Sequence, residues 1–292
     1  MDFGRVVTAM VTPFNEQGID EENLPLLIEH LISNGTDSVV VAGTTGESPT
    51  LTHDEKLRLF ERVVTLANGR IRVIAGTGTN DTASSIRLAK EAEACGVDGL
   101  LLVAPYYNKP SQEGLYQHFR AIAASTAIPI MLYNIPGRTS ININAETILR
   151  LAEIDNIVAV KESSGNLSQV SNIIRRKPRD FRVYSGDDYL LLPILAIGGH
   201  GIVSVASHVA GKPIADMISN YLEGRTDQAT ELHNRLLPLF EGLFITSNPV
   251  MVKFALNDSG IPVGGVRLPL VRETDEQRDY MRNILQDIQD LI

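Results

Sequence analysis

The stretch Ile157-Val158-Ala159-Val160-Lys161-Glu162-Ser163-Ser164-Gly165 runs from four apolar residues straight into a lysine and a small polar turn. A short, wholly apolar, β-branched run is typical of a strand buried on both faces, as in a parallel sheet. Lysine is almost never buried without a partner, so Lys161 either reaches solvent from the strand end or is held at a site. Removal from water favours the neutral amine, which is the nucleophilic form. Taken alone, the motif favours the solvent-reaching alternative.

Similar apolar runs alternate with amphipathic segments along most of the chain. The segment 52–67 has the spacing of a helix and opens with a capping box at Thr52 and Glu55. Eight uninterrupted strand–helix units predict an α/β fold, a TIM (β/α)8 barrel. A doubly wound open sheet is the alternative, but the first strand runs into Thr12-Pro-Phe-Asn15 and not into a glycine-rich turn. The predicted strands are 5–11, 37–42, 72–75, 99–104, 129–133, 157–160, 181–184 and 201–205.

The last part of the chain has a different pattern. The eighth predicted helix is 213–222, and from residue 226 onward the sequence contains no strand-like run. Helical spacing continues at 227–244, 249–258 and 273–292. We therefore expect a barrel domain over residues 1–224 and a C-terminal three-helix extension over 225–292. The extension is expected to cover one side of the barrel or to mediate assembly.

Composition restricts the class of function. The 292 residues are 43% hydrophobic and 21% charged, as in a soluble globular protein. A net charge of −9, without a Lys/Arg block, argues against a nucleic-acid partner. No apolar run approaches the roughly 18–20 residues that span a bilayer, and the N-terminus lacks a signal-peptide pattern. A single cysteine, Cys95, is typical of a reducing compartment. We expect a cytoplasmic protein with no membrane partner.

Active sites of TIM barrels lie at the carboxyl ends of the strands, and the loops there hold hydroxyls, glycines, tyrosines, one arginine and one lysine. None of the six histidines is paired at ligand spacing, so we expect neither a metal nor another cofactor. Gly43-Thr-Thr-Gly46 and Gly76-Thr-Gly78 are weak nucleotide motifs but suit a small carboxylate; each is equally well explained as a turn that needs glycine. Asp187 and Asp188 are predicted to cap the following helix.

The loop residues favour amine catalysis. Tyr133 and Lys161 end neighbouring strands of a barrel wound in sequence order. A neutral lysine attacks a ketone to give an iminium, which acts as an electron sink, and a nearby tyrosine hydroxyl transfers protons. Arg138 offers a planar fork for a carboxylate. Rim packing for the tyrosine and a surface position for the arginine are the structural alternatives, and only the combination points to catalysis.

Three motifs together resemble the dihydrodipicolinate synthase family of Schiff-base aldolases and lyases: Gly43-Thr-Thr-Gly-Glu47-Ser48, Tyr133-Asn-Ile-Pro-Gly-Arg-Thr139 and Val160-Lys161-Glu162. The resemblance covers the whole chain. It implies a lyase that condenses pyruvate with L-aspartate-4-semialdehyde in lysine and diaminopimelate biosynthesis, assembled as a homotetramer, a dimer of dimers. The alternative is another pyruvate-dependent member of the superfamily, acting on N-acetylneuraminate or a keto-deoxy sugar acid, which would not be expected to carry Arg138. A silent regulatory barrel would be expected to have lost Lys161 or Tyr133.

The resemblance also implies roles for individual residues. Lys161 matches the Schiff-base lysine and Tyr133 the proton-relay tyrosine, with Thr44 and Tyr107 completing the relay. In the family that second tyrosine reaches the site of the neighbouring subunit. The implied substrate-binding residues are Thr45 for the pyruvate carboxylate, Arg138 for the carboxylate of the semialdehyde, and Gly186 with Ile202 or Val203 for the pocket wall.

Lysine-inhibited members of the family carry an allosteric cluster, and this chain departs from it. Sensitive members have histidine at position 56 and glutamate at position 84, where this chain has Lys56 and Ser84. Lys56 repels the ammonium group of a lysine effector, and Ser84 lacks the attraction that a glutamate would exert on that group. Each effect is worth on the order of 1 kcal/mol. The sequence therefore predicts weak or absent inhibition by lysine. The matching positions are Ser48, His53, Lys56, Asn80, Ser84 and Tyr106.

Overall fold

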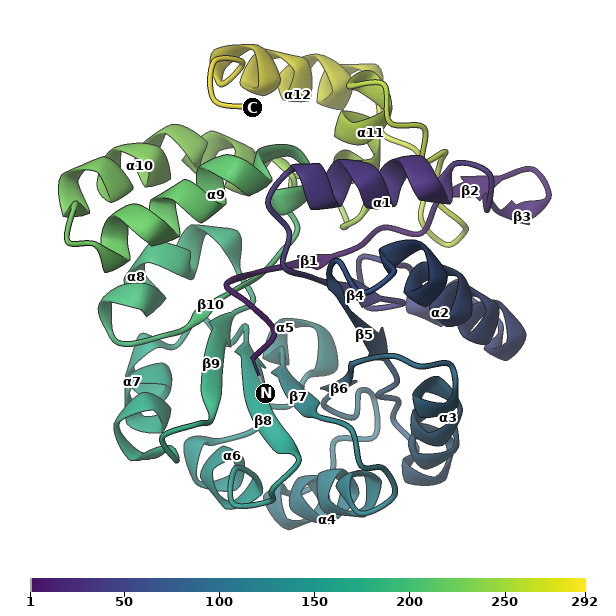
Figure 1. Cartoon of the computed structure of the whole chain (residues 1–292), viewed down its shortest axis with the longest axis vertical. Coiled ribbons are helices and arrows are strands. Elements are labelled where there is room, and N and C mark those ends of the chain that lie inside the picture. The colour runs from purple at the N-terminus through teal and green to yellow at the C-terminus, as the bar shows by residue number, and fades with distance from the viewer. Residues whose placement is uncertain (1) are drawn as a thin grey trace.

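The computed structural model describes residues 2–292, and its centre is a closed barrel of eight parallel strands ringed by helices (Figure 1). The barrel closes because β1 pairs with β10 on one side and with β4 on the other. The predicted (β/α)8 barrel is therefore confirmed, and the open-sheet alternative is wrong. The strands are β1 (Val6–Ala9), β4 (Ser38–Val41), β5 (Arg72–Gly76), β6 (Gly99–Val103), β7 (Ile130–Asn134), β8 (Ile157–Glu162), β9 (Arg182–Ser185) and β10 (Gly201–Ser204).

The helices that follow the strands form the outer ring. The capping box at Thr52 and Glu55 is present at the start of α2, with both reciprocal hydrogen bonds. The last helix of the ring, α9, begins at Ser207, earlier than the predicted 213, and its turn at Ala210 is not helical. The helices of the ring are α1 (Leu24–Ser33), α2 (His53–Ala67), α3 (Thr82–Ala94), α4 (Gln112–Ala123), α6 (Ala145–Leu151), α7 (Leu167–Arg176), α8 (Leu191–Ala196) and α9 (Ser207–Leu222).

Two short strands and one short α-helix were not predicted. The strands β2 (Phe14–Asn15) and β3 (Gly18–Ile19) form an antiparallel hairpin after β1. The helix α5 (Pro136–Thr139) follows β7 and carries Arg138. Each is too short to show a hydrophobic period, which is the signal from which the larger elements were predicted.

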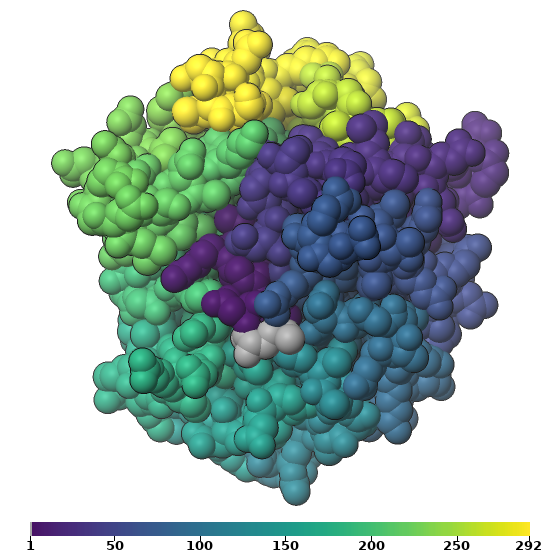
Figure 2. Space-filling view, viewed as in Figure 1, coloured from purple at the N-terminus to yellow at the C-terminus, as the bar shows by residue number. Residues whose placement is uncertain are grey.

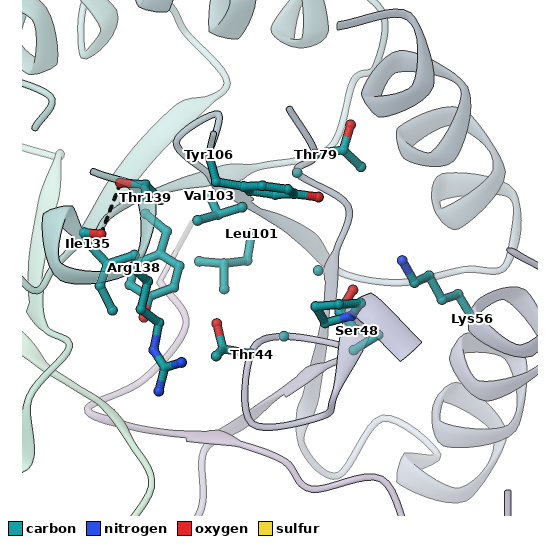
Figure 3. Close-up of a pocket in the computed structure, with 16 residues that line it drawn as sticks. Thr44, Ser48, Lys56, Thr79, Leu101, Val103, Tyr106, Ile135, Arg138 and Thr139 are labelled. Atoms are coloured by element: carbon teal, nitrogen blue, oxygen red, sulfur yellow. Dashed lines mark hydrogen bonds between the residues drawn. The ribbon is translucent and has the colours of Figure 1, made fainter. Parts of the chain in front are cut away.

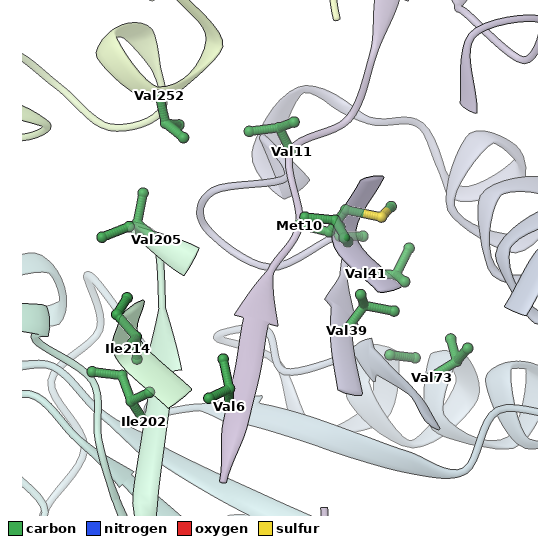
Figure 4. Close-up of a cluster of buried hydrophobic side chains, with 14 of the residues drawn as sticks. Val6, Met10, Val11, Val39, Val41, Val73, Ile202, Val205, Ile214 and Val252 are labelled. Carbon is green, nitrogen blue, oxygen red and sulfur yellow. The ribbon is translucent and has the colours of Figure 1, made fainter. Parts of the chain in front are cut away.

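Apolar side chains form two layers. One lies between the strands and the helices; part of it is drawn in Figure 4, with Val39 and Ile202 from the strands and Ile214 from α9. The other fills the barrel interior and includes Met131, Tyr133 and Tyr184. At the amino end, the N-terminal segment lies over the middle of the barrel (Figure 2). The interior is therefore packed, and open space for a ligand is expected at the carboxyl ends of the strands.

The C-terminal extension consists of α10 (Thr226–Gly242), α11 (Val250–Asp258) and α12 (Asp275–Asp287), as predicted. In Figure 1, α11 and α12 lie beside α1 and the β2–β3 hairpin. Val252 of α11 belongs to the same apolar cluster as Val11 and Val205, which follow the carboxyl ends of β1 and β10 (Figure 4). The extension therefore packs against the end of the barrel that carries the active site in this fold. The domain boundary at residue 224 remains a prediction.

Along residues 2–292, none of the helices is long and apolar enough to cross a membrane.

Candidate active site

The strand register places Lys161 between two tyrosines. Tyr133 of β7 pairs with Lys161 of β8, which pairs with Tyr184 of β9. Lys161 has the same parity as Ala159 and therefore points into the barrel. Its Nζ lies 4.2 Å from the centroid of the Tyr133 ring. Because Lys161 is only 6% exposed, the solvent-reaching alternative is wrong, and the lysine is held inside the carboxyl end of the barrel.

A buried polar network fixes the end of β8 from the outside. Glu162 points away from the barrel axis and is buried, and this desolvation raises the pKa of its carboxyl group. It accepts hydrogen bonds from Asn134 Nδ2 at 3.1 Å, from the backbone N–H of Ser164 at 2.8 Å and from Gln169 Nε2 at 3.2 Å. These bonds tie β8 to β7 and to α7, so they hold Lys161 in register with Tyr133.

Gly186 lies directly against the lysine side chain. A Cβ atom at this position would come within 1.9 Å of Ser163 Oγ and 2.8 Å of Lys161 Cε. Only glycine leaves room for the extended lysine beside the end of β9. The predicted pocket-wall residue is thus placed next to Lys161.

The aspartates that follow Gly186 do not have the predicted role. Burial raises the pKa of Asp187 to about 6, while the positive charge of Lys161 acts in the opposite direction. Asp187 makes no capping hydrogen bond. Asp188 is buried and accepts hydrogen bonds from Ser204 Oγ at 2.5 Å and from the backbone N–H of Ala206 at 3.1 Å. The helix-cap prediction is wrong because Asp188 accepts hydrogen bonds from the end of β10, and Asp187 lies near Lys161.

A cavity of about 290 Å³ opens at this end of the barrel. Figure 3 shows Thr44 and Arg138 on one side of it, and Ser48 and Lys56 on the other. The Tyr106 ring extends across the cavity between them. Tyr133 also contributes to the wall. Residues predicted for catalysis and residues predicted for regulation therefore line one continuous space.

Two further predicted substrate residues are buried, and neither lines this cavity. Thr45 is 3% exposed, and its Oγ accepts a hydrogen bond from Asn248 Nδ2 at 2.9 Å. Val203 lies in the interior cluster with Tyr133 and Tyr184, whereas Ile202 packs in the outer layer. Of the two residues proposed for the pocket wall, the structure places Val203 on the inner side of the barrel.

The structure does not bring Tyr107 into the site of its own chain. Its side chain is 88% exposed and its φ is +74°, in the left-handed region. Asn108 beside it donates a hydrogen bond from Nδ2 to the backbone oxygen of Asn80 at 2.8 Å. This contact holds the loop that presents Tyr107 on the surface.

The predicted allosteric residues are only partly brought together. Lys56 lines the cavity, and burial lowers the pKa of its ammonium group. His53 instead pairs with Glu91 at 2.9 Å, and the backbone N–H of Ser84 is bound by the Asp81 carboxylate at 2.6 Å. Neither His53 nor Ser84 lines the cavity.

The sequence interpretation missed two residues that contact the loop after β4. Asn248 binds Thr45, and Lys253 of α11 pairs with Glu47 at 2.7 Å. Lys253 stands in the otherwise apolar run Val250–Leu256, the same kind of signal that singled out Lys161. Within residues 2–292, no group of three or more His, Cys, Asp or Glu side chains is arranged to hold a metal ion.

Comparison with known proteins shows which family this chain belongs to. The profile of the Dihydrodipicolinate synthetase family matches residues 2–288. The chain belongs to this family. It is 59% identical over 281 residues to 4-hydroxy-tetrahydrodipicolinate synthase 1 of Halalkalibacterium halodurans, with 95% of each chain covered. The predicted family and lyase class are confirmed.

Solved structures agree with this membership. A dihydrodipicolinate synthase of Bacillus anthracis superimposes with a TM-score of 0.96 at 51% identity, covering 98% of both chains. A dihydrodipicolinate synthase of Cyanidioschyzon merolae, solved with lysine bound, gives a TM-score of 0.97 at 48% identity and also covers 98% of both chains. The barrel and its helical extension are therefore shared as one unit.

Gly186→Ala is expected to reduce synthase turnover by about 100-fold, the size of effect that a displacement of about 1 Å at a reacting group can cause. The added methyl group displaces Lys161 without removing any catalytic atom. Steady-state kinetics measures the loss, and circular dichroism checks the fold. Gly137→Ala is the matched control, because no heavy atom lies within 4 Å of a Cβ atom built there. Wild-type turnover in Gly186→Ala would contradict this placement of the lysine.

Proposed function

We propose that this chain is a 4-hydroxy-tetrahydrodipicolinate synthase that condenses pyruvate with L-aspartate-4-semialdehyde through a Schiff base on Lys161. The reaction belongs to lysine and diaminopimelate biosynthesis. The observation that carries the proposal is the buried pair of Lys161 and Tyr133 beside a cavity that also contains Arg138. Relatives that bear this enzyme name support the choice of substrates.

Lys161 is assigned the nucleophilic step. Its neutral amine attacks the C2 carbonyl of pyruvate, and the carbonyl oxygen leaves as water to give an iminium. Loss of a proton from the C3 methyl group then gives an enamine. The enamine carbon attacks the aldehyde of the second substrate to form the new carbon–carbon bond, which regenerates the iminium. The amino group of that substrate then attacks the iminium carbon and displaces Lys161, so that the cyclic product leaves and the free amine is restored. Asp187, held near Lys161, offers a negative charge to the iminium.

Tyr133 is assigned the proton transfers that dehydration and enamine formation require. Its position opposite Lys161 in the strand register supports this role. General acid–base catalysis of this kind contributes about 10²–10⁴-fold to a rate. Thr44 lines the same cavity and continues the relay. Tyr107 completes it in a neighbouring subunit, and the exposure of its side chain supports such a contact.

The carboxylates of the two substrates are assigned to different elements. Thr44 and Thr45, on the loop after β4, bind that of pyruvate. Arg138, on α5, binds that of the semialdehyde as a charge-assisted pair. Gly186 and Val203 shape the wall beside the lysine. The iminium formed on Lys161 supplies the electron sink, so we propose that the enzyme needs no metal or other cofactor. A cytoplasmic homotetramer, a dimer of dimers, is the assembly that we propose.

Borohydride reduction in the presence of pyruvate is expected to trap one stable adduct, which peptide mass spectrometry locates on Lys161. Lys161→Ala is expected to abolish the adduct because no amine remains at the end of β8. Lys90→Ala, which removes an exposed lysine, is the control. An adduct on another residue would contradict the mechanism, and an adduct that forms only with sugar acids would contradict the substrate.

Arg138→Ala is expected to raise KM for the semialdehyde while leaving KM for pyruvate unchanged. A hydrogen bond to a charged group is worth about 1.5–3 kcal/mol, which corresponds to roughly 10–150-fold. Steady-state kinetics with each substrate varied in turn measures the two constants. A variant that loses activity only toward sugar acids would point to the other branch of the superfamily.

Lysine is expected to inhibit this enzyme weakly or not at all. Lys56 lines the cavity and repels the ammonium group of the effector, and its pKa is lowered only by burial. Turnover measured against lysine concentration tests this. The double variant Lys56→His with Ser84→Glu is expected to gain sensitivity, whereas Lys90→His is the matched control. Inhibition of the wild type at micromolar lysine would overturn the prediction.

A further inference from the structure

The loop Gly43–Ser48, which carries Thr44 and Thr45, is held in place by contacts with the C-terminal extension. Glu47 adopts a φ of +55°, which is uncommon for a residue other than glycine. Its carboxylate is buried. A strained backbone of this kind persists only where the surrounding contacts determine it. Those contacts come from residues that follow α10.

Both carboxylate oxygens of Glu47 meet the extension. Oε1 lies 2.7 Å from Nζ of Lys253, and Oε2 accepts the backbone N–H of Arg267 at 2.9 Å. Lys253 Nζ also donates to the backbone oxygen of Gly265 at 2.7 Å and lies 4.3 Å from the centroid of the Phe14 ring. Burial lowers the pKa of Lys253 to about 8, and the Glu47 charge acts in the opposite direction.

A buried ion pair of this kind is a poor source of stability. The desolvation of two charges offsets most of their attraction, and well-packed apolar residues often stabilise a protein as much or more. What the pair does provide is a fixed geometry, because both side chains are buried and each has a backbone partner besides the other. Here the residue that the pair fixes is Glu47, two positions after Thr45.

A second contact reaches Thr45 itself. Thr45 Oγ accepts a hydrogen bond from Asn248 Nδ2 at 2.9 Å. A hydroxyl that accepts one bond keeps its own proton to donate to another group. The Asn248 contact therefore leaves the Thr45 proton for an anionic acceptor.

We propose that Asn248 and Lys253 are positioning residues, which hold the loop Gly43–Ser48 so that the Thr44 and Thr45 hydroxyls meet the carboxylate of pyruvate. This inference rests on the proposed function. It assigns to the C-terminal extension an indirect part in binding the first substrate. The residues themselves do not touch the substrate, and they act through Thr45 and Glu47.

The test is the pyruvate dependence of borohydride trapping on Lys161 in the full-length enzyme. Asn248→Asp keeps the shape of the side chain but turns the donor into an acceptor and adds a negative charge. The pyruvate concentration for half-maximal trapping is expected to rise about tenfold or more, the size of a lost hydrogen bond to a charged group. KM for the semialdehyde is expected to stay unchanged, which a general loss of structure would not allow.

The ion pair is tested with a double variant, because Lys253→Met alone leaves a buried unpaired carboxylate. Glu47→Gln with Lys253→Met removes both charges and is expected to raise half-saturating pyruvate in the same way, with a melting temperature near that of the wild type. Arg282→Met is the matched control, since it breaks the exposed pair with Asp258 in the same extension. The pyruvate concentration for half-maximal trapping in this control is expected to equal that of the wild type.

The outcomes separate the two proposals. Unchanged pyruvate dependence in Asn248→Asp and in the double variant, or an equal rise of both substrate constants, overturns the positioning role and leaves the Schiff-base mechanism standing. A wild-type enzyme that forms no pyruvate adduct overturns both. A pyruvate-specific rise in both variants, absent from Arg282→Met, supports the positioning role.

Discussion

The hydrogen-bonded register of β7, β8 and β9 is the constraint on which the rest of this site depends. A parallel ladder fixes which residues stand side by side, and a slip of one position would turn every side chain to the other face. Lys161 would then point into the outer layer, and Glu162 into the barrel. The closed barrel resists such a slip because each strand has two partners, and the Glu162 network adds hydrogen bonds to Asn134 and Gln169 at the point where the slip would begin.

Charge is distributed unevenly around the cavity. The whole chain carries a net charge of −9, yet Arg138 and Lys56 both line the same space. Both substrates that we propose are carboxylates, so a local excess of positive charge favours their entry. Asp187 and Asp188 do not line the cavity, and they lie near Lys161, where a negative charge favours an iminium.

Local patterns in the sequence were sufficient for the barrel and for the central pair. Apolar runs, the capping box at Thr52 and the order of the strands predicted that Tyr133 and Lys161 lie together. The prediction failed where a side chain is used by a distant part of the chain. Asp188 looked like a helix cap, but its acceptors are satisfied by Ser204 and the end of β10. The contacts of Asn248 and Lys253 with the loop after β4 join the two halves of the chain, and no local period predicts such contacts.

The ion pair between Glu47 and Lys253 has a consequence for how the enzyme is made. Domains generally fold from the N-terminus during synthesis, and the eight strands precede the residue that neutralises Glu47. Until α11 and the segment after it have been synthesised, the Glu47 carboxylate has neither Lys253 nor the backbone N–H of Arg267 as a partner. A chain that stops after the barrel strands would keep Lys161 and Tyr133 in its sequence but would lack the partners of Glu47 and Thr45.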